Sequence, residues 1–388
     1  MPAHSFIKNL QIMLFRKNTA LAIVGLLLLP ALSALAQNPY ADLDEEVRQL
    51  RVKRKTKIPE LAAALTQNRK TEMEKCRAIF VWIVENITYD MATLEKQKVR
   101  SKDKLPSQEA ADVLADRLGV CEGYTNLFMA LCQQAGIRTV AIPGKSKSAG
   151  EVSNVGHIWL MAYADGRWRL FDPTWGSGHR DADTQKFQRK FSETYFDASP
   201  EALIQTHYPS DPLAQMLPKP LTFDEFKQGV SSERLRQKTE PGDPMGFQAW
   251  QDSVEAWLKL DPRLQTLRAA ERALWVNPDY GEALTRVGAW HYDNAVDMFN
   301  EMIDKSNQFV QERRIKPKSH YEEEYRQIAK IREKIETAKS FFEKVPRSDY
   351  AWRNAGPYLE SLRNLKESVK AFEADIKKTY KANFGGRG

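Results

Sequence analysis

Three residues of this chain have the types needed for a nucleophile, its base and the carboxylate that orients the base. They are Cys121, His157 and Asp172. In such a triad the thiolate attacks a carbonyl carbon, while the imidazole removes the thiol proton and later protonates the leaving amine. The carboxylate fixes the imidazole tautomer and stabilises its charged form. The chemistry would be acyl transfer from an amide, provided that the fold brings the three side chains together.

Cys121 differs from the other two cysteines in its surroundings. Cys76 and Cys132 lie among large apolar residues, where a free cysteine behaves as a small hydrophobe, so we expect both to be buried; a bridge between them is an alternative without support in the sequence. We expect Gly119 to end a helix that begins near Ser107, which places Cys121 in the first turn of the next helix. The free amides and partial positive charge there stabilise a thiolate, although on spacing alone a structural cysteine is an equal alternative. The backbone N–H of Cys121 is a natural oxyanion donor, and the sequence assigns no second donor.

Among the six histidines, His157 is the best candidate for the base. It begins a run of strand-forming residues that ends at the turn dipeptide Asp165-Gly166, and a second strand follows over residues 167–172. A hairpin about this turn would bring His157 and Asp172 side by side with a register offset of two residues, which a bulge or a longer turn accommodates. The alternative for His157 alone is a structural histidine on a half-buried strand. The remaining histidines lie in the N-terminal leader, in polar or irregular stretches, or in the C-terminal helical region: His4, His179, His207, His291 and His320.

Four blocks of sequence around these residues resemble the transglutaminase-like superfamily of papain-like folds. They are residues 76–90, 119–124, 157–159 and 168–176. Three later segments, at 191–196, 207–209 and 219–226, look like the extension found in the branch that includes kyphoscoliosis peptidase and related exported bacterial proteins. The resemblance covers roughly residues 60–228, and it implies a catalytic triad of Cys121, His157 and Asp172.

The chain departs from the family pattern at one position near the expected site. Many relatives carry Asn after the His-x-Trp element, whereas this chain has Leu160. The change either weakens an active-site hydrogen bond or reflects ordinary drift. Because the superfamily also contains members that have lost catalysis, a non-catalytic module that binds a protein or peptide is the alternative function.

The N-terminus has the features of a secretory signal peptide. Three basic residues precede an apolar run too short to cross a bilayer, and the small-residue site Ala34-Leu35-Ala36 predicts cleavage before Gln37. We therefore expect a signal peptide over residues 1–36, export to the periplasm or the extracellular space, and no stable membrane anchor; an uncleaved anchor is the alternative. Removal of those three bases leaves 55 of the 58 Lys and Arg residues against 51 Asp and Glu, a balance that predicts no nucleic-acid partner.

A change of composition beyond about residue 240 indicates a second domain. The stretch Pro241-Gly242-Asp243-Pro244 is the expected hinge, and amphipathic helical periodicity dominates after it. Residues 270–292 look like one degenerate tetratricopeptide helical hairpin. A helix with alternating charges is expected over 319–346 and a final helix from about Pro357 to Tyr380, followed by a disordered tail at 385–388.

These observations predict an α+β protein with a helical C-terminal domain. A transglutaminase-like, papain-like domain, in which a helix carrying the cysteine packs on an antiparallel sheet, is expected over 37–240, and an all-α domain that is partly tetratricopeptide-like over 241–388. The predicted activity is thiol acyl transfer on amide bonds of a protein or peptide, as a peptidase or amidase or else as a transglutaminase, since the triad forms the same acyl-enzyme in each case. No cofactor and no metal are implied. The C-terminal helices are a candidate surface for a protein partner.

Overall fold

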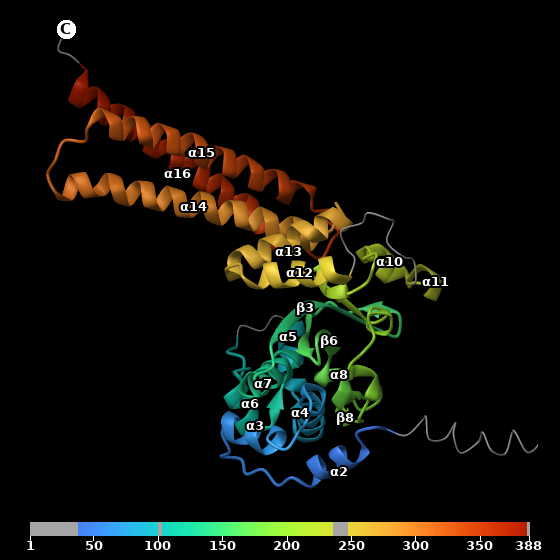
Figure 1. Cartoon of the computed structure of the whole chain (residues 1–388). Helices are drawn as coiled ribbons and strands as arrows, with labels where there is room; N and C mark the ends of the chain where they lie inside the picture. Colours follow the sequence, from blue (N-terminus) through green and yellow to red (C-terminus); the bar gives the residue numbers. More distant parts are fainter. Residues whose placement is uncertain (1–37, 100–102, 236–246, 386–388) are drawn as a thin grey trace, which may run out of the picture.

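The computed structural model describes residues 38–99, 103–235 and 247–385. Figure 1 shows a region of mixed helices and strands, from which long C-terminal helices extend as an arm. The α+β class with a helical C-terminal region is confirmed. The expected signal peptide, the expected hinge and residues 386–388 of the expected tail lie outside the described residues.

Two N-terminal helices pack on a third that is buried over most of its length. The two are α2 (Ala41–Gln49) and α3 (Ile58–Thr66), and the third is α4 (Glu72–Asn86). A capping box begins α4, because the Thr71 hydroxyl accepts the Glu74 N–H at 3.1 Å and the Glu74 carboxylate accepts the Thr71 N–H at 3.4 Å. Every side chain from Cys76 to Val84 is buried, so α4 has no solvent face over this stretch and forms the centre of the core.

The helix that carries Cys121 begins where the sequence predicts. Cys121 is the first residue of α7 (Cys121–Gln134). The preceding helix α6 (Ala110–Asp116) ends earlier than expected, because Arg117 takes the left-handed conformation with φ 57°. Gly119 therefore does not end that helix. It belongs instead to β2 (Leu118–Gly119), which pairs in parallel with β1 (Thr88–Tyr89) and precedes α7 directly.

A five-stranded antiparallel sheet holds His157 and ends one residue before Asp172. Its strands lie in the order β4 (Glu151–Val152), β3 (Thr139–Ser148), β5 (His157–Ala164), β6 (Arg167–Phe171), and β9 (His207–Pro209) also pairs with β3. The turn between β5 and β6 consists of Asp165 and Gly166, with φ of 49° and 78°, as a two-residue hairpin turn requires.

The hairpin forms without the bulge that the sequence analysis allowed for. Ala164 pairs with Arg167 and Leu160 with Phe171, so the register is regular. Asp172 lies one residue beyond β6 and not on it. In this register Asp172 is a diagonal neighbour of His157, and long side chains reach across that distance in antiparallel sheets.

Each face of the sheet is covered by its own apolar layer. Leu160, Ala162 and Phe171 pack with α4 and α7 in the main core. Trp159, Met161 and other residues of the opposite face pack with Trp250 of α12 (Phe247–Leu258). Side chains alternate between the faces along β5, as the pleat dictates.

Short elements make up the rest of the first region. Helix α5 (Met91–Lys98) lies between β1 and α6. The elements between β6 and the helical region are α8 (Pro173–Ser177), β7 (Gly178–Arg180), β8 (Phe187–Arg189), η1 (Glu193–Tyr195), α9 (Pro200–Leu203), η2 (Pro212–Gln215), α10 (Phe223–Gln228) and α11 (Ser232–Leu235), and β9 lies among them.

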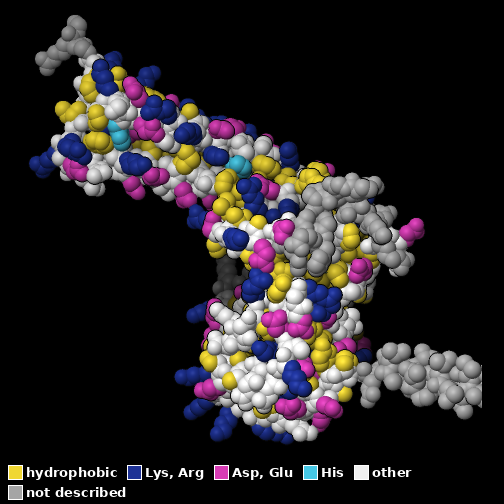
Figure 2. Space-filling view, viewed as in Figure 1, with side chains coloured by type: hydrophobic (Ala, Val, Ile, Leu, Met, Phe, Trp, Pro, Cys, Tyr) yellow, Lys and Arg dark blue, Asp and Glu magenta, His cyan; other side chains and the backbone are white. Residues whose placement is uncertain are grey.

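The C-terminal helices form a bundle with its own core. They are α13 (Pro262–Val276), α14 (Gly281–Gln311), α15 (Lys318–Lys344) and α16 (Trp352–Phe384). The expected start of the last helix at about Pro357 is wrong by five residues, because Ala351 and Ala355 ahead of it are buried in the bundle core and the proline lies inside the helix. Basic and acidic side chains are interspersed along this arm (Figure 2), as the charge pattern of residues 319–346 predicts. Among the described residues, no helix has both the length and the apolar character for a membrane span.

Candidate active site

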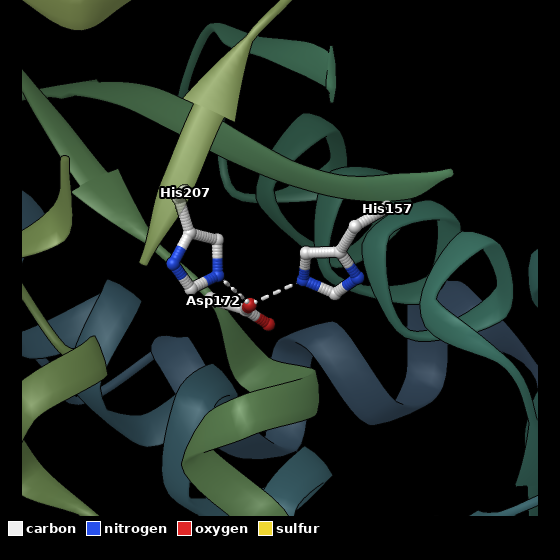
Figure 3. A group of neighbouring side chains, drawn as sticks. All are labelled: His157, Asp172 and His207. Carbon is white, nitrogen blue, oxygen red and sulfur yellow. Dashed lines mark hydrogen bonds and ion pairs between the residues drawn. The ribbon is translucent and has the colours of Figure 1, made fainter. Parts of the chain in front are cut away.

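The centre of the candidate site is the carboxylate of Asp172, which is fully buried. Asp172 is the N-cap of α8, where its Oδ1 accepts the N–H groups of Thr174 at 2.8 Å and Trp175 at 3.0 Å. Its Oδ2 faces two imidazoles, with Nε2 of His157 at 2.7 Å and Nε2 of His207 at 2.8 Å (Figure 3). Burial alone would raise the pKa of Asp172, but the interactions with the two histidines hold it well below its usual range.

His157 is the charged member of the two histidines. It is the first residue of β5, it is 8% exposed, and its ring stacks on Trp159 with centroids 5.8 Å apart. Burial lowers the pKa of His157, but the charge and hydrogen bond of Asp172, together with a hydrogen bond to the Cys121 thiol, outweigh it and raise the pKa to about 10. Because Nε2 faces Asp172, Nδ1 is the ring nitrogen left for the thiol.

His207 is the site residue that the sequence analysis missed. It lies on β9, where Ser146 of β3 is its register partner, and it is 1% exposed. Burial lowers the pKa of His207 more than the neighbouring Asp172 raises it, so this imidazole is neutral. Its Nε2–H can then donate to Asp172 while Nδ1 accepts from the Thr206 hydroxyl, 2.7 Å away. The signal for this role was the His-Tyr-Pro segment, one of the blocks that resemble the family.

Cys121 is the accessible cysteine of the chain. All three cysteines lie in the described ranges and are free thiols; Cys76 and Cys132 are fully buried, as expected, and Cys121 is half-buried. Burial, helped by the adjacent Cys76 thiol, raises the pKa of Cys132 well above its usual value, which keeps that thiol unreactive. The backbone N–H of Cys121 is among the first amides of α7, which have no acceptor within the helix.

Cys121 and His157 line one cleft with a volume of about 550 Å³. The sheet contributes Gly144 and Lys145 to its wall, and the N-terminal part of α14 contributes Glu282 and Arg286. The structure therefore brings the predicted residues to one place: Asp172 bonds to His157, and His157 and Cys121 share an open cleft.

Comparison with known proteins identifies the kind of domain that carries these residues. Residues 59–173 match the family model of the transglutaminase-like superfamily. The chain contains a transglutaminase-like domain. It is 32% identical to kyphoscoliosis peptidase of Mus musculus over 197 residues, which cover 49% of this chain and 29% of that protein. It is 34% identical to the Homo sapiens protein of the same name over 182 residues, covering 45% of this chain and 27% of that one. A solved structure described as a TGase aligns with 40% of this chain and 37% of its own length, at 18% identity and a TM-score of 0.27.

The chain thus spans less than a third of the length of these two curated relatives. The match covers the transglutaminase-like domain, which holds Cys121, His157 and Asp172 within residues 59–173. His207 lies beyond that range, and the helices from α12 onward lie beyond it as well.

Leu160 lies apart from the hydrogen-bonding groups of the domain. It is fully buried in the main core, on the face of β5 opposite to Trp159 and Met161. A polar side chain at this position would need a partner within an apolar layer. Its placement therefore favours ordinary drift over the loss of an active-site hydrogen bond.

Two imidazoles and a carboxylate are also a ligand set that transition metals use. The ligand-type atoms of His157, Asp172 and His207 all lie within 4.8 Å of one another. Here, however, both Nε2 atoms lie at hydrogen-bonding distance from the same oxygen, and the three residues are at most 8% exposed. Hydrogen bonds account for the whole arrangement.

Proposed function

We propose that the transglutaminase-like domain is a thiol acyl-transfer enzyme that acts on amide bonds of peptides or proteins. The observation that supports it is the buried His157–Asp172 pair beside the half-buried Cys121 in an open cleft. In this proposal Cys121 is the nucleophile, His157 the general base and acid, and Asp172 the group that orients and charges the imidazole.

The reaction proceeds in two stages. The Cys121 sulfur forms a bond to the carbonyl carbon, the proton held on His157 passes to the amide nitrogen, and the C–N bond breaks to release an amine. Water, deprotonated by His157, then attacks the thioester and releases a carboxylate and the thiol. An amine in place of water would give a new amide, which is the transglutaminase outcome. We favour hydrolysis, a preference that rests on the names of the relatives and on the predicted export.

Alkylation by iodoacetamide tests whether Cys121 is activated. An ordinary thiol with a pKa near 8.5 is about 1% thiolate at pH 6.5. His157, whose pKa is raised to about 10, carries its charge at that pH, and a nearby imidazolium favours the thiolate form of a cysteine. We expect Cys121 to react readily at pH 6.5 and to lose about tenfold or more of that rate in His157→Gln. Peptide mass spectrometry locates the label, with Cys76 and Cys132 as buried internal controls.

Two outcomes of this experiment count against the proposal. A Cys121 rate that is unchanged in His157→Gln would leave the domain as a non-catalytic binding module. If the thiol is activated, a glutamine-containing peptide with an added amine shows whether water or the amine resolves the acyl-enzyme. We expect hydrolysis of the glutamine side chain to glutamate. Incorporation of the amine without hydrolysis would mean that the enzyme is a transglutaminase and not a peptidase.

A further inference from the structure

Part of the wall of the cleft that contains Cys121 and His157 belongs to the helical region. Glu282, Thr285 and Arg286 of α14 line the same cleft as Cys121 and His157. Figure 1 shows α13 and the adjoining end of the long helices above the sheet that carries β3. A substrate that fills this cleft therefore contacts the start of α14 as well as the thiol.

Paired charges hold this part of the helical region in place. Lys145 of β3 is 8% exposed and pairs with Glu282 at 2.7 Å. Arg272 of α13 donates from its Nε to Asp211 at 2.9 Å, and its Nη2 bonds the second oxygen of the same carboxylate. In both contacts the positive group already has its anion.

Arg286 differs from these two basic residues. Its guanidinium has five N–H donors, and its hydrogen bond in the structure is to the Ser210 hydroxyl at 3.4 Å. In the described part of the chain no Asp or Glu carboxylate lies within 4.0 Å of it, because Glu282, one helical turn earlier, pairs with Lys145. A half-buried guanidinium in a cleft wall without an anion is suited to a carboxylate, which it can bind through two parallel hydrogen bonds.

A second, more apolar cavity lies next to Arg286. Its volume is about 210 Å³, and it shares Pro143, Ser210 and Arg286 with the cleft. Its remaining wall is largely apolar and includes Ile142, Met161, Leu213 and Trp257. A substrate whose carboxylate meets Arg286 could therefore place an apolar side chain in this cavity.

We propose that Arg286 is a specificity-determining residue that binds a carboxylate of the peptide substrate, next to an apolar side chain of that peptide. The inference rests on the proposed function for the identity of the reacting thiol. Glu122 adjoins Cys121 and also lines the cleft, so the acidic group of the substrate belongs at the α14 wall and not beside the thiol. The carboxylate is either the C-terminus of a peptide or an acidic side chain.

The experiment compares matched alkylating peptides on the full chain. The probes are N-iodoacetyl-Ala-Leu, the same peptide as its C-terminal amide, and N-iodoacetyl-Asp-Leu amide, with the Cys121 label quantified by mass spectrometry. We expect one carboxylate probe to react about tenfold faster than the uncharged amide. The faster of the two carboxylate probes then shows whether the preferred carboxylate is a peptide C-terminus or an acidic side chain.

Variants assign the preference to Arg286. Arg286→Gln keeps a donor for Ser210 but removes the charge, and we expect the ratio of its rate with the carboxylate probe to its rate with the uncharged amide to fall about tenfold. Arg263→Gln, at an α13 position that is 79% exposed, removes the same charge and should keep the preference. Arg286→Lys retains the charge without the planar fork and should keep part of the preference.

Two results overturn the inference. One is equal reaction of all three probes with the unmodified chain, and the other is a carboxylate preference that survives in Arg286→Gln. Rates are measured at pH 6.5 and again at pH 9, where any accessible thiol reacts. A failure of thiol activation appears as slow labelling at pH 6.5 by iodoacetamide, whatever the probe charge, and is therefore distinct from a failure of carboxylate recognition.

Discussion

At the scale of single residues, two histidines bind one carboxylate oxygen but differ in charge. His207 contributes to the low pKa of Asp172, so its removal should raise that pKa toward the usual value. We expect His207→Leu to slow the His157-dependent alkylation of Cys121 by about tenfold, the cost of a hydrogen bond to a charged group. We also expect the low-pH limb of the reaction to move to higher pH, because Asp172 must stay ionised.

The matched variant His207→Gln retains an N–H donor at a similar reach. It should keep most of the rate and leave the low-pH limb close to its original position. The pH profile of Cys121 labelling in the three proteins is the measurement. If Gln and Leu behave alike, His207 acts through packing and not as a donor to Asp172.

The three predicted site residues could be found because each is marked by its type and by a local element. Cys121 begins a helix that apolar periodicity reveals, and His157 begins a strand that ends at Asp165-Gly166. His207 could not be found in this way. Its strand β9 is three residues long, and its partner Asp172 lies 35 positions away, so nothing local indicates the contact.

At the scale of elements, strand β3 joins both histidines to the sheet. Gly144 is the register partner of His157 on β5 and of Pro209 on β9. A Cβ at this position would lie 2.2 Å from the Tyr208 carbonyl oxygen and 2.9 Å from the Pro209 Cα, so β9 would have to move. We expect Gly144→Ala to cost about 1–3 kcal/mol of stability and to reproduce the pH profile of His207→Leu.

Gly156→Ala is the control for this prediction. It lies in the same cleft, but its added Cβ would meet its nearest atom, the Gly144 carbonyl oxygen, at 3.8 Å, which is ordinary contact. Urea denaturation and the pH profile of labelling should separate the two variants. If the two variants have equal stability and the same pH profile, β9 can shift without loss of the His207 contact.

The boundaries of the helices and strands show which sequence features are sufficient to place an element and which are not. The hairpin of β5 and β6 follows from a run of strand-forming residues and from a turn that needs positive φ at two residues. The predicted end of α6 at Gly119 is two residues late, because glycine is the usual residue at a left-handed position and here Arg117 occupies it. Asp172 was assigned to a strand although it caps α8, and the cap explains both its orientation and its two amide hydrogen bonds.

At the scale of the whole molecule, the composition indicated a separate helical region but not how it meets the sheet. Helix α12 follows the expected hinge, and its Trp250 and Val254 pack on the face of the sheet opposite the main core. The start of α14 then forms a wall of the cleft. Such contacts join segments about 100 residues apart, and hydrophobic periodicity shows only that a face is buried, not which partner buries it.

This packing predicts unequal effects of two tryptophan substitutions. Trp250 is 5% exposed and its indole N–H donates to the Leu213 carbonyl oxygen at 2.7 Å, whereas Trp275 on α13 is 74% exposed. Trp250→Ala should cost about 3–5 kcal/mol, since it leaves a cavity over the sheet and removes the hydrogen bond to Leu213, and Trp275→Ala should change the stability by less than about 0.5 kcal/mol. Thermal unfolding of the full chain measures the difference.

Labelling of the buried Cys76 and Cys132 provides a second measurement, because these thiols react only when the transglutaminase-like domain opens. Faster labelling in Trp250→Ala would show that α12 stabilises that domain, and identical labelling in both variants would mean that α12 rests on the sheet without supporting it.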